Sequence, residues 1–354
     1  MRAAIVSIGS AVPPRAVSSA ALAHRLDVTD EWIRSRTGIR ERHVAPTGGV
    51  SELIVPAAVQ CIERRGITAD EVDCIIVATT TPDYLFPPTA AIVQGKLGAG
   101  AAWGFDLSAA CSGFAYALLV GEGLISTGRA RRVLLCAGER MSAITNPDDR
   151  GTSILFGDAA TAVLLEAAPE DEERGIIDSV CRTDPVDAEL LYMPAGGSAR
   201  PASLESVLQR EHFVVQDGPA VFRAAVEGLS DVTNALLARN RLGVGDIDWL
   251  IPHQANRRII DAVARRVGVP QDKLASNIDH YGNTAATSIP LCIAEWYERG
   301  ELQPGDRVVL TSFGAGFTMS AVYLRWSMAP LPTPAAPNGS LDAAPTAVRT
   351  TVGA

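Results

Sequence analysis

The sequence has 354 residues, of which 47% are hydrophobic and 20% are charged, and its formal net charge at pH 7 is −9. This length and composition predict a soluble globular protein that buries a large core, either as two domains or as one large double unit. The acidic balance argues against nucleic acid as the main partner, because nucleic-acid binding needs a basic surface that neutralises phosphates.

The chain begins with the run Met1-Arg-Ala-Ala-Ile-Val-Ser-Ile-Gly9, which predicts a first β-strand. This run lacks the charged region, apolar stretch and cleavage site of a signal peptide. No later apolar run reaches the roughly eighteen residues of a membrane-spanning helix. We therefore expect a cytoplasmic protein without a membrane partner.

Six cysteines are scattered along the chain at positions 61, 74, 111, 136, 181 and 292, and several of them lie inside apolar runs. They show no Cys-x-x-Cys spacing of the kind that binds metals. The sequence therefore predicts no disulfide framework and no metal site, which fits a reducing cytoplasm.

Apolar, β-branched runs alternate with alanine-rich stretches at helical spacing, a pattern typical of α/β proteins with buried sheets. The strand-like runs are 72–80, 132–138, 161–165, 248–252, 308–312 and 320–323. Two of them repeat at an offset of 175 residues: residues 73–79 resemble residues 248–254, and residues 132–135 resemble residues 307–310. The repeat predicts two similar α/β halves.

An acidic connector at 168–174 marks the expected boundary between these halves. We predict an amino-terminal half at 1–170 that carries a nucleophilic cysteine, and a carboxy-terminal half at 171–326 that carries a histidine and an asparagine. The tail at 327–354 is rich in proline and small residues without a hydrophobic period, so we expect it to be disordered.

Three segments predict the active site. Cys111 in Asp106-Leu-Ser-Ala-Ala-Cys-Ser-Gly-Phe114 is placed as in the first turn of a helix, where unpaired N–H groups and the helix dipole favour a thiolate. His253 directly follows a predicted strand, at the edge where parallel sheets keep their ligands. Asn283 lies in a Gly-Asn-Thr turn, and the offset of 175 maps Cys111 onto position 286 beside it. Together they predict a thiol nucleophile with two hydrogen-bonding partners.

A basic stretch follows His253. Residues 255–267 read as a helix that carries Arg257, Arg258, Arg265 and Arg266, and positions 258 and 265 share one face. Such a face on an acidic protein is either a docking surface or simply a solvated helix surface.

These motifs resemble the β-ketoacyl-acyl carrier protein synthase III family, over about residues 1–326. Supporting segments are 30–42, 149–158 and 313–318. The resemblance implies a thiolase fold, with two similar α/β halves in a five-layered αβαβα arrangement. Elongating ketoacyl synthases use a cysteine with two histidines, and degradative thiolases use a second cysteine in a late Cys-Gly motif. This chain has Asn283 where elongating synthases have a second histidine, and it has Phe313-Gly-Ala-Gly316 where thiolases have the late Cys-Gly motif.

The implied reaction is a decarboxylative Claisen condensation of an acyl-CoA starter with malonyl-acyl carrier protein (malonyl-ACP). It yields a β-ketoacyl-acyl carrier protein, CoA and CO2, initiates fatty-acid synthesis and needs no cofactor. The implied partners are the two substrates and a second copy of the chain in a homodimer.

The resemblance also implies roles for individual residues. Cys111, His253 and Asn283 would be catalytic, and the backbone N–H groups of Cys111 and Ala315 would form an oxyanion hole. The other implied contacts are Trp32 and Arg150 around the adenine of CoA, Arg36 on its phosphates, Asn256 on the pantetheine arm, Arg223, Arg258, Arg265 and Arg266 on the acyl carrier protein, and Phe86 of the partner subunit with Phe313 at the acyl pocket.

Two other functions stay open on the sequence. One is a related acyltransferase or starter-loading enzyme of specialised, polyketide-type metabolism that uses an acyl-cysteine. The other is a non-catalytic subunit that binds CoA or acyl carrier protein, although retention of all three polar residues favours condensation. Two departures from the family pattern are Pro219 near the pantetheine channel and Ala315 in place of a glycine. Acetyl, propionyl and branched starters all remain possible.

Overall fold

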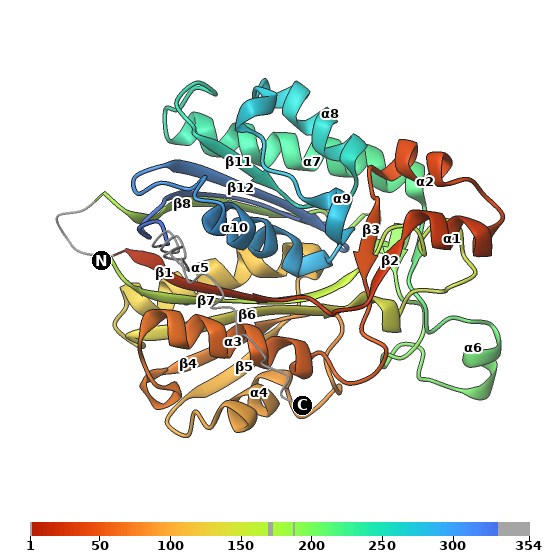
Figure 1. Cartoon of the computed structure of the whole chain (residues 1–354), viewed down its shortest axis with the longest axis horizontal. Helices are drawn as coiled ribbons and strands as arrows, with labels where there is room; N and C mark the ends of the chain where they lie inside the picture. Colours follow the sequence, from red (N-terminus) through yellow and green to blue (C-terminus); the bar gives the residue numbers. More distant parts are fainter. Residues whose placement is uncertain (1, 169–172, 187, 332–354) are drawn as a thin grey trace, which may run out of the picture.

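The computed structural model describes residues 2–168, 173–186 and 188–331, and two β-sheets face each other across a layer of helices (Figure 1). The first sheet has the order β1-β7-β6-β4-β5 and the second has the order β11-β12-β13-β8. Their strands are β1 Ala3–Ala11, β4 Cys74–Ala78, β5 Trp103–Leu107, β6 Arg132–Arg140, β7 Asp158–Ala167, β8 Gly175–Thr183, β11 Trp249–Pro252, β12 Arg307–Gly314 and β13 Thr318–Arg325. The strands predicted from the sequence are all present.

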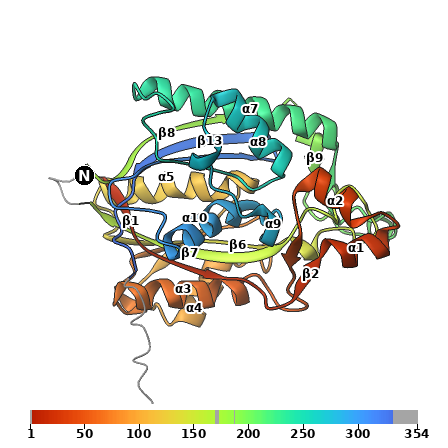
Figure 2. The same ribbon diagram turned by 45° about the horizontal axis from the view of Figure 1, so that its top comes forward.

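Helices form three layers around the two sheets (Figures 1 and 2). The central layer holds α5 Gly113–Ser126 and α10 Ser288–Glu298; the outer layers hold α3 Ser51–Arg65 with α4 Thr89–Leu97, and α7 Gly218–Arg239 with α8 Arg257–Val267. The central helices pack against both sheets in one continuous core. The predicted five-layered αβαβα arrangement is confirmed.

The composition of the helices explains these positions. Glu122 is the one charged residue in α5, as expected of a helix that must bury its surface between two sheets. In α8, by contrast, Ile259, Ile260 and Val263 are buried and the arginines are exposed. A helix with one apolar face covers a sheet from outside.

The two halves match at the predicted offset of 175 residues. The turns η2 Ala110–Ser112 and η6 Ala285–Thr287 precede α5 and α10, and β6 and β12 follow. Ala110 and Ala285, at equivalent positions, both have left-handed backbones, with φ of 48° and 47°. Two similar halves are therefore present in the structure as well as in the sequence.

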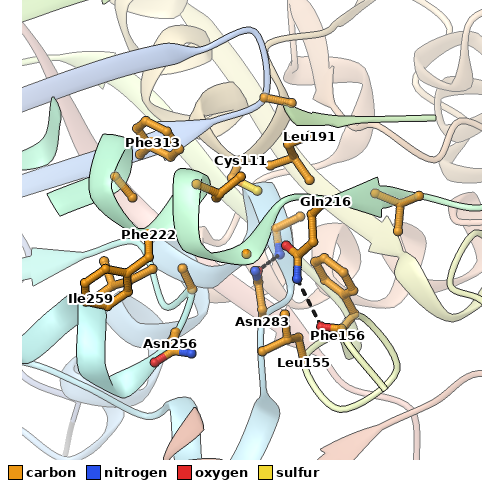
Figure 3. A pocket seen from close by; sticks show the side chains of 18 of the residues that line it. Cys111, Leu155, Phe156, Leu191, Gln216, Phe222, Asn256, Ile259, Asn283 and Phe313 are labelled. Atoms are coloured by element: carbon orange, nitrogen blue, oxygen red, sulfur yellow. Dashed lines mark hydrogen bonds between the residues drawn. The ribbon is translucent and has the colours of Figure 1, made fainter. Parts of the chain in front are cut away.

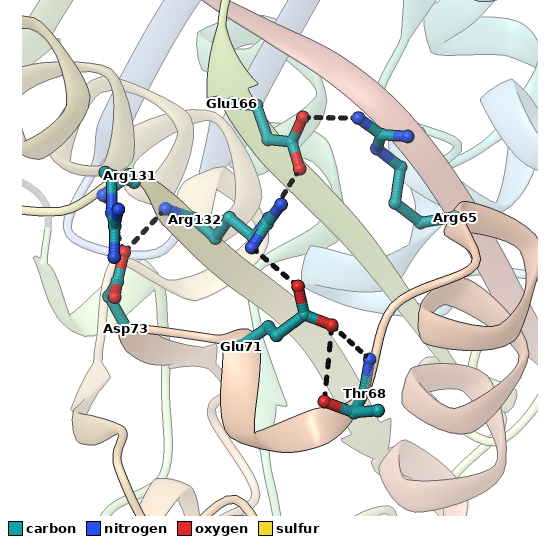
Figure 4. A network of polar contacts seen from close by, with 7 residues as sticks. All are labelled: Arg65, Thr68, Glu71, Asp73, Arg131, Arg132 and Glu166. Carbon is teal, nitrogen blue, oxygen red and sulfur yellow. Dashed lines mark hydrogen bonds and ion pairs between the residues drawn. The ribbon is translucent and has the colours of Figure 1, made fainter.

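Equivalent polar contacts close the ends of the two sheets. In the first sheet Arg132 donates to Glu166 at 2.8 Å, and Asp73 accepts from the backbone N–H of Arg132 at 2.9 Å (Figure 4). In the second sheet Asp248 accepts from the N–H of Arg307 at 2.8 Å. The same carboxylate-to-backbone contact thus fixes the start of the central strand in each half.

Smaller elements gather beside the sandwich, next to the ends of both sheets (Figure 1). They are β2 Ala16–Ser18, α1 Ser19–Leu26, α2 Asp30–Thr37, β3 Glu41–His43, β9 Leu191–Tyr192, α6 Leu204–Leu208, β10 Val215–Gln216 and α9 Ile278–Tyr281. Helix α2 lies against α8, because Gly38 leaves room where a Cβ would come within 2.4 Å of Arg257 Cβ.

Strands of the first sheet come from residues 3–167 and those of the second from residues 175–325. We keep the boundary between 1–170 and 171–326 as a proposal, because residues 169–172 lie outside the described residues. Most of the predicted disordered tail, at 332–354, also lies outside them. Within the described ranges, no helix is long and apolar enough to cross a membrane.

Candidate active site

A cavity of about 690 Å³ opens between α2, α7 and α8 and reaches the ends of the central helices. Cys111, His253 and Asn283 all line it. Figure 3 shows Cys111 and Asn283 at this cavity, with Phe222 and Phe313 along its wall. Three segments far apart in the sequence therefore meet at one site.

Cys111 sits in the turn η2, directly before α5. This turn packs so closely on β12 that a Cβ at Gly314 would come within 2.7 Å of the Cys111 backbone nitrogen. The Ser112 hydroxyl donates to the carbonyl of Thr318 at 3.1 Å, and the Thr318 hydroxyl donates to the carbonyl of Ala109 at 3.0 Å. The second half therefore holds the turn that carries Cys111 in place.

The expected thiolate is not what the resting site favours. Burial, and after it the charge of Glu139, raise the pKa of the Cys111 thiol to about 12. Glu139 is itself fully buried at the end of β6, and burial raises its pKa to about 7 although Thr80 and Thr81 donate hydrogen bonds to it. Burial of the thiol therefore opposes the thiolate that a position before a helix favours.

Alkylation of Cys111 by iodoacetamide is expected to accelerate about tenfold per pH unit between about pH 7 and pH 10, because only the thiolate reacts. Intact mass on a time course measures the rate, and Cys111→Ala assigns the site. Free glutathione is the control, since its ordinary thiol pKa makes the rate level off above about pH 9. A Cys111 rate that levels off near neutral pH would instead restore the low thiolate pKa predicted from the sequence.

His253 follows β11 and is 2% exposed. Its Nδ1 lies 2.6 Å from the hydroxyl of Ser288, the first residue of α10, and the same hydroxyl accepts from the N–H of Gln254 at 3.3 Å. Burial lowers the pKa of His253 to about 3, so the ring is neutral at physiological pH. The tautomer in which Nδ1 accepts from the Ser288 hydroxyl carries the ring proton on Nε2, where it faces away from Ser288.

Asn283 lies in the turn after α9 and is 6% exposed. Its side-chain Oδ1 accepts from the N–H of Ala285 at 2.9 Å, which leaves the Nδ2 group free to donate into the cavity. Its backbone N–H donates to the carbonyl of Leu155 at 2.9 Å, and its carbonyl accepts from the N–H of Gly157 at 3.0 Å. The backbone of Asn283 is therefore held on both sides by the chain at 155–157.

The four residues predicted to bind CoA all line the cavity. The Arg36 guanidinium stacks 4.3 Å from the centre of the Trp32 ring, whereas Arg150 lies 3.7 Å from the carboxylate of Asp27. The cation on Trp32 is thus Arg36 in this structure. Asn256 caps α8, with its side-chain oxygen accepting from the N–H of Arg258 at 2.8 Å.

The predicted basic face is split between the cavity and the surface. Arg223 and Arg258 line the cavity, whereas Arg265 and Arg266 are exposed on α8 and do not line it. Arg266 also lies 3.8 Å from Asp231. The four side chains therefore extend from the cavity along the outer helices.

The remaining predicted positions fall as follows. Phe313, Ala315 and Pro219 line the cavity. Ala315 is not among the residues with positive φ, so its side chain causes no backbone strain. Phe86 does not line the cavity of its own chain and is 84% exposed.

Several supporting residues were missed from the sequence. Ser288, which holds His253, stands within the motif that also contains Asn283, but nothing in that motif indicates the contact. Glu139 follows the fully apolar run 133–138, and this lone acidic residue is the signal that could have identified it. Gly314 belongs to a glycine-rich segment whose packing against Cys111 depends on the meeting of two halves.

Comparison with known proteins gives consistent results. The family profiles described as 3-Oxoacyl-[acyl-carrier-protein (ACP)] synthase III and as its C-terminal part match residues 105–185 and 237–326. A protein of Chlorobaculum tepidum named Beta-ketoacyl-[acyl-carrier-protein] synthase III is 49% identical over 92% of this chain and 100% of its own length. One of the same name from Koribacter versatilis is 46% identical over 92% and 98%.

Solved structures agree with these sequence matches. A 3-oxoacyl-(acyl carrier protein) synthase III from Pseudomonas aeruginosa superposes with a TM-score of 0.86 at 39% identity, covering 94% of this chain and 100% of that chain. The priming β-ketosynthase of the R1128 polyketide biosynthetic pathway superposes with a TM-score of 0.85 at 33% identity, covering 93% and 97%.

Proposed function

Because the chain belongs to the β-ketoacyl-[acyl-carrier-protein] synthase III family and is an acyltransferase of fatty-acid biosynthesis, we propose that it condenses an acyl-CoA starter with malonyl-ACP. The products are a β-ketoacyl-acyl carrier protein, CoA and CO2. The observation that carries this proposal is the meeting of Cys111, His253 and Asn283 at one cavity. A nucleophile and two hydrogen-bond donors match the two chemical steps.

In the first step the Cys111 sulfur attacks the thioester carbonyl of acyl-CoA, and the bond from that carbonyl to the CoA sulfur breaks. We propose that the thiol proton passes to the CoA sulfur as that sulfur leaves, because the His253 ring accepts at Nδ1 and is protonated at Nε2 and so has no free nitrogen to take it up. Backbone N–H groups of Cys111 and Ala315 are the proposed donors to the developing oxyanion. CoA leaves as its thiol, carrying the proton away.

In the second step malonyl-ACP occupies the same cavity. His253 Nε2–H and the Asn283 Nδ2 group donate hydrogen bonds to its thioester carbonyl, where negative charge accumulates as CO2 departs. The enolate then attacks the acyl-Cys111 carbonyl, the bond from that carbonyl to the Cys111 sulfur breaks, and the released thiolate takes up one proton from water. Loss of CO2 generates the carbanion, so the step needs no strong base and no cofactor.

Trp32, Arg36, Arg150 and Asn256 are the proposed contacts for CoA. They line the cavity, and the Arg36 and Arg150 side chains are exposed near its opening. For the adenine to stack between Trp32 and Arg150, either Arg36 moves off the Trp32 ring or the adenine stacks on the opposite face of that ring. Arg36 would then be free for the phosphates.

The acidic acyl carrier protein is proposed to dock on Arg223, Arg258, Arg265 and Arg266. The double substitution Arg265→Glu and Arg266→Glu is expected to raise KM for malonyl-ACP on the order of tenfold at low salt, and less at high salt, because exposed charges steer encounter. Acylation by acyl-CoA should stay unchanged, since neither residue lines the cavity. The double substitution Arg129→Glu and Arg131→Glu, at two exposed residues at the far end of the first sheet, is the matched control. Equal effects of both variants would contradict this docking site.

A homodimer is the proposed assembly. Strand β5 is the edge of the first sheet, and its Trp103 is 47% exposed and stacks on Phe105. The loop after β4 exposes Leu85 and Phe86 at 82% and 84%. An open edge with apolar side chains favours pairing with a second copy, which would bring Phe86 to the partner's acyl pocket. Sedimentation equilibrium tests this, and a monomer at micromolar concentration would contradict it.

We further propose a cytoplasmic location, which the free thiols of all six cysteines support.

A panel of acyl-CoA thioesters followed by malonyl-ACP tests the proposed reaction. The expected result is a protein that gains one acyl group by intact mass and then releases CO2 and a β-ketoacyl-acyl carrier protein. The thioester that reacts best identifies the starter. Failure to acylate would contradict the proposal and favour a non-catalytic subunit.

A second candidate is starter loading in polyketide-type metabolism, favoured by the likeness to the R1128 priming β-ketosynthase. Efficient turnover with a polyketide carrier protein but not with the carrier protein of fatty-acid synthesis would support this second candidate. Acylation without release of CO2 would instead indicate a related acyltransferase.

A further inference from the structure

Arg42 is a buried cation without a carboxylate partner. It is the central residue of β3 and is 1% exposed, and among the described residues it forms no ion pair. Burial lowers its pKa to about 10, partly offset by Asp30 and Glu41, so the side chain stays charged at physiological pH. Burying an unpaired charge costs free energy, so the hydrogen bonds of Arg42 must offset this cost.

The guanidinium of Arg42 binds backbone and hydroxyl oxygens from separate segments. Nη1 donates to the Val17 carbonyl at 3.3 Å and to the Ser19 hydroxyl at 3.1 Å. Nη2 donates to the Ile154 carbonyl at 2.6 Å. These contacts tie β2 and the start of α1 to the chain at 154–157.

The segment at 154–157 is also the one that holds Asn283. Leu155 accepts from the Asn283 N–H, Gly157 donates to the Asn283 carbonyl, and Phe156 forms a parallel β-bridge with Asn283. Figure 3 shows Leu155 and Phe156 next to Asn283. One side of this segment is thus bound to Arg42 and the other to Asn283.

Direct packing supports the same connection. A Cβ at Gly157 would lie 3.1 Å from Arg42 Cβ, and a Cβ at Gly282 would lie 3.3 Å from it. The Arg42 stem therefore lies against both glycines that flank the bridge to Asn283. At both positions the tighter contact is with a backbone oxygen, that of Tyr281 at 2.3 Å from a Cβ at Gly157 and that of Leu155 at 2.7 Å from a Cβ at Gly282, and Gly282 also has a φ of 65°.

Resting on the proposed function, we propose that Arg42 is a positioning residue for Asn283: it fixes the backbone at 154–157 and thereby aims the Asn283 amide at the thioester carbonyl of malonyl-ACP. Such a role concerns the decarboxylation step. Acyl transfer from CoA to Cys111 uses neither this amide nor the segment at 154–157 as a donor. Ile154 and Leu155 also pack with Trp32, a proposed CoA contact, so loss of Arg42 should slow CO2 release far more than acylation.

Arg42→Lys tests this role, because an ammonium keeps the charge but cannot reproduce the planar fork that bridges the two sides. Acylation by acyl-CoA, measured by intact mass, should stay within about twofold, and release of CO2 from malonyl-ACP should fall about tenfold to hundredfold, the usual effect of a small misplacement. Arg140→Lys is the matched control. Arg140 also binds backbone carbonyls, those of Ala45 and Gly48, but does not touch the segment at 154–157.

A double-mutant cycle separates positioning from general stability. If Arg42 acts through Asn283, Arg42→Lys should have little further effect on CO2 release in an Asn283→Ala background. Additive losses, or equal losses in both half-reactions, would overturn the proposal. If Arg42→Lys does not fold, Ser19→Ala removes one hydrogen-bond acceptor of Arg42 with a smaller change. This variant should also lose more CO2 release than acylation, and equal losses would overturn the proposal. A wild-type protein that releases no CO2 would instead refute the proposed function.

Discussion

Cys111→Ala is expected to abolish the acyl-enzyme and to reduce condensation by at least about 10⁴-fold, because Cys111 is the one cysteine among the described residues that line the cavity. The turn that carries Cys111 should survive, since the contacts of Thr318 with Ala109 and Ser112 do not involve the sulfur. Intact mass after incubation with acyl-CoA should show no gain. Condensation is followed by the β-ketoacyl product.

The control for this variant is Cys181→Ala, which removes an exposed cysteine on β8. That variant should acylate and condense like the parent protein. Slow decarboxylation of malonyl-ACP should persist in Cys111→Ala, because His253 and Asn283 remain. A Cys111→Ala protein that still gains one acyl group would place the nucleophile elsewhere.

Asn283→Asp should lower CO2 release from malonyl-ACP by about a hundredfold to a thousandfold, the typical loss when one oxyanion donor is removed. Aspartate is nearly isosteric and can still accept from the Ala285 N–H. It replaces the donating Nδ2 group by an oxygen and adds negative charge beside the forming enolate. Release of labelled CO2 from malonyl-ACP measures the effect.

Acylation of Cys111 by acyl-CoA is the internal control for Asn283→Asp and should change little. Thermal unfolding of the variant should also stay close to that of the parent, because the backbone bonds to Leu155 and Gly157 are kept. A parallel loss of acylation and CO2 release would mean that Asn283 maintains the shape of the site and does not stabilise the enolate.

The sequence predicted much of the fold because its pattern is repeated. The run at 73–79 and its counterpart at 248–254 became β4 and β11 with the residues that follow them, and the offset of 175 also places Cys111 and position 286 in equivalent turns. Local signals sufficed for these elements, because buried parallel strands are nearly uniform in composition.

The electrostatic state of the site could not be predicted in this way. The dipole of α5 is a local property, but the burial that raises the pKa of Cys111 is produced by both halves together. The bond from Ser288 to His253 spans 35 residues and the bond from Arg42 to Ile154 spans 112. The Trp32 and Arg36 pair was different, since a spacing of four residues on a helix already predicts contact.

The shared cavity has a kinetic consequence. The proposed nucleophile and the two proposed donors line the same cavity. We therefore expect the acyl-CoA and malonyl-ACP thioesters to compete for this space. CoA must depart before the second substrate reaches the acyl-cysteine, which gives double-displacement, ping-pong kinetics with parallel lines in a double-reciprocal plot. Excess malonyl-ACP should then inhibit turnover by occupying the free enzyme. The expected order, acyl-CoA first and malonyl-ACP second, thus follows from the sharing of one cavity by both substrates.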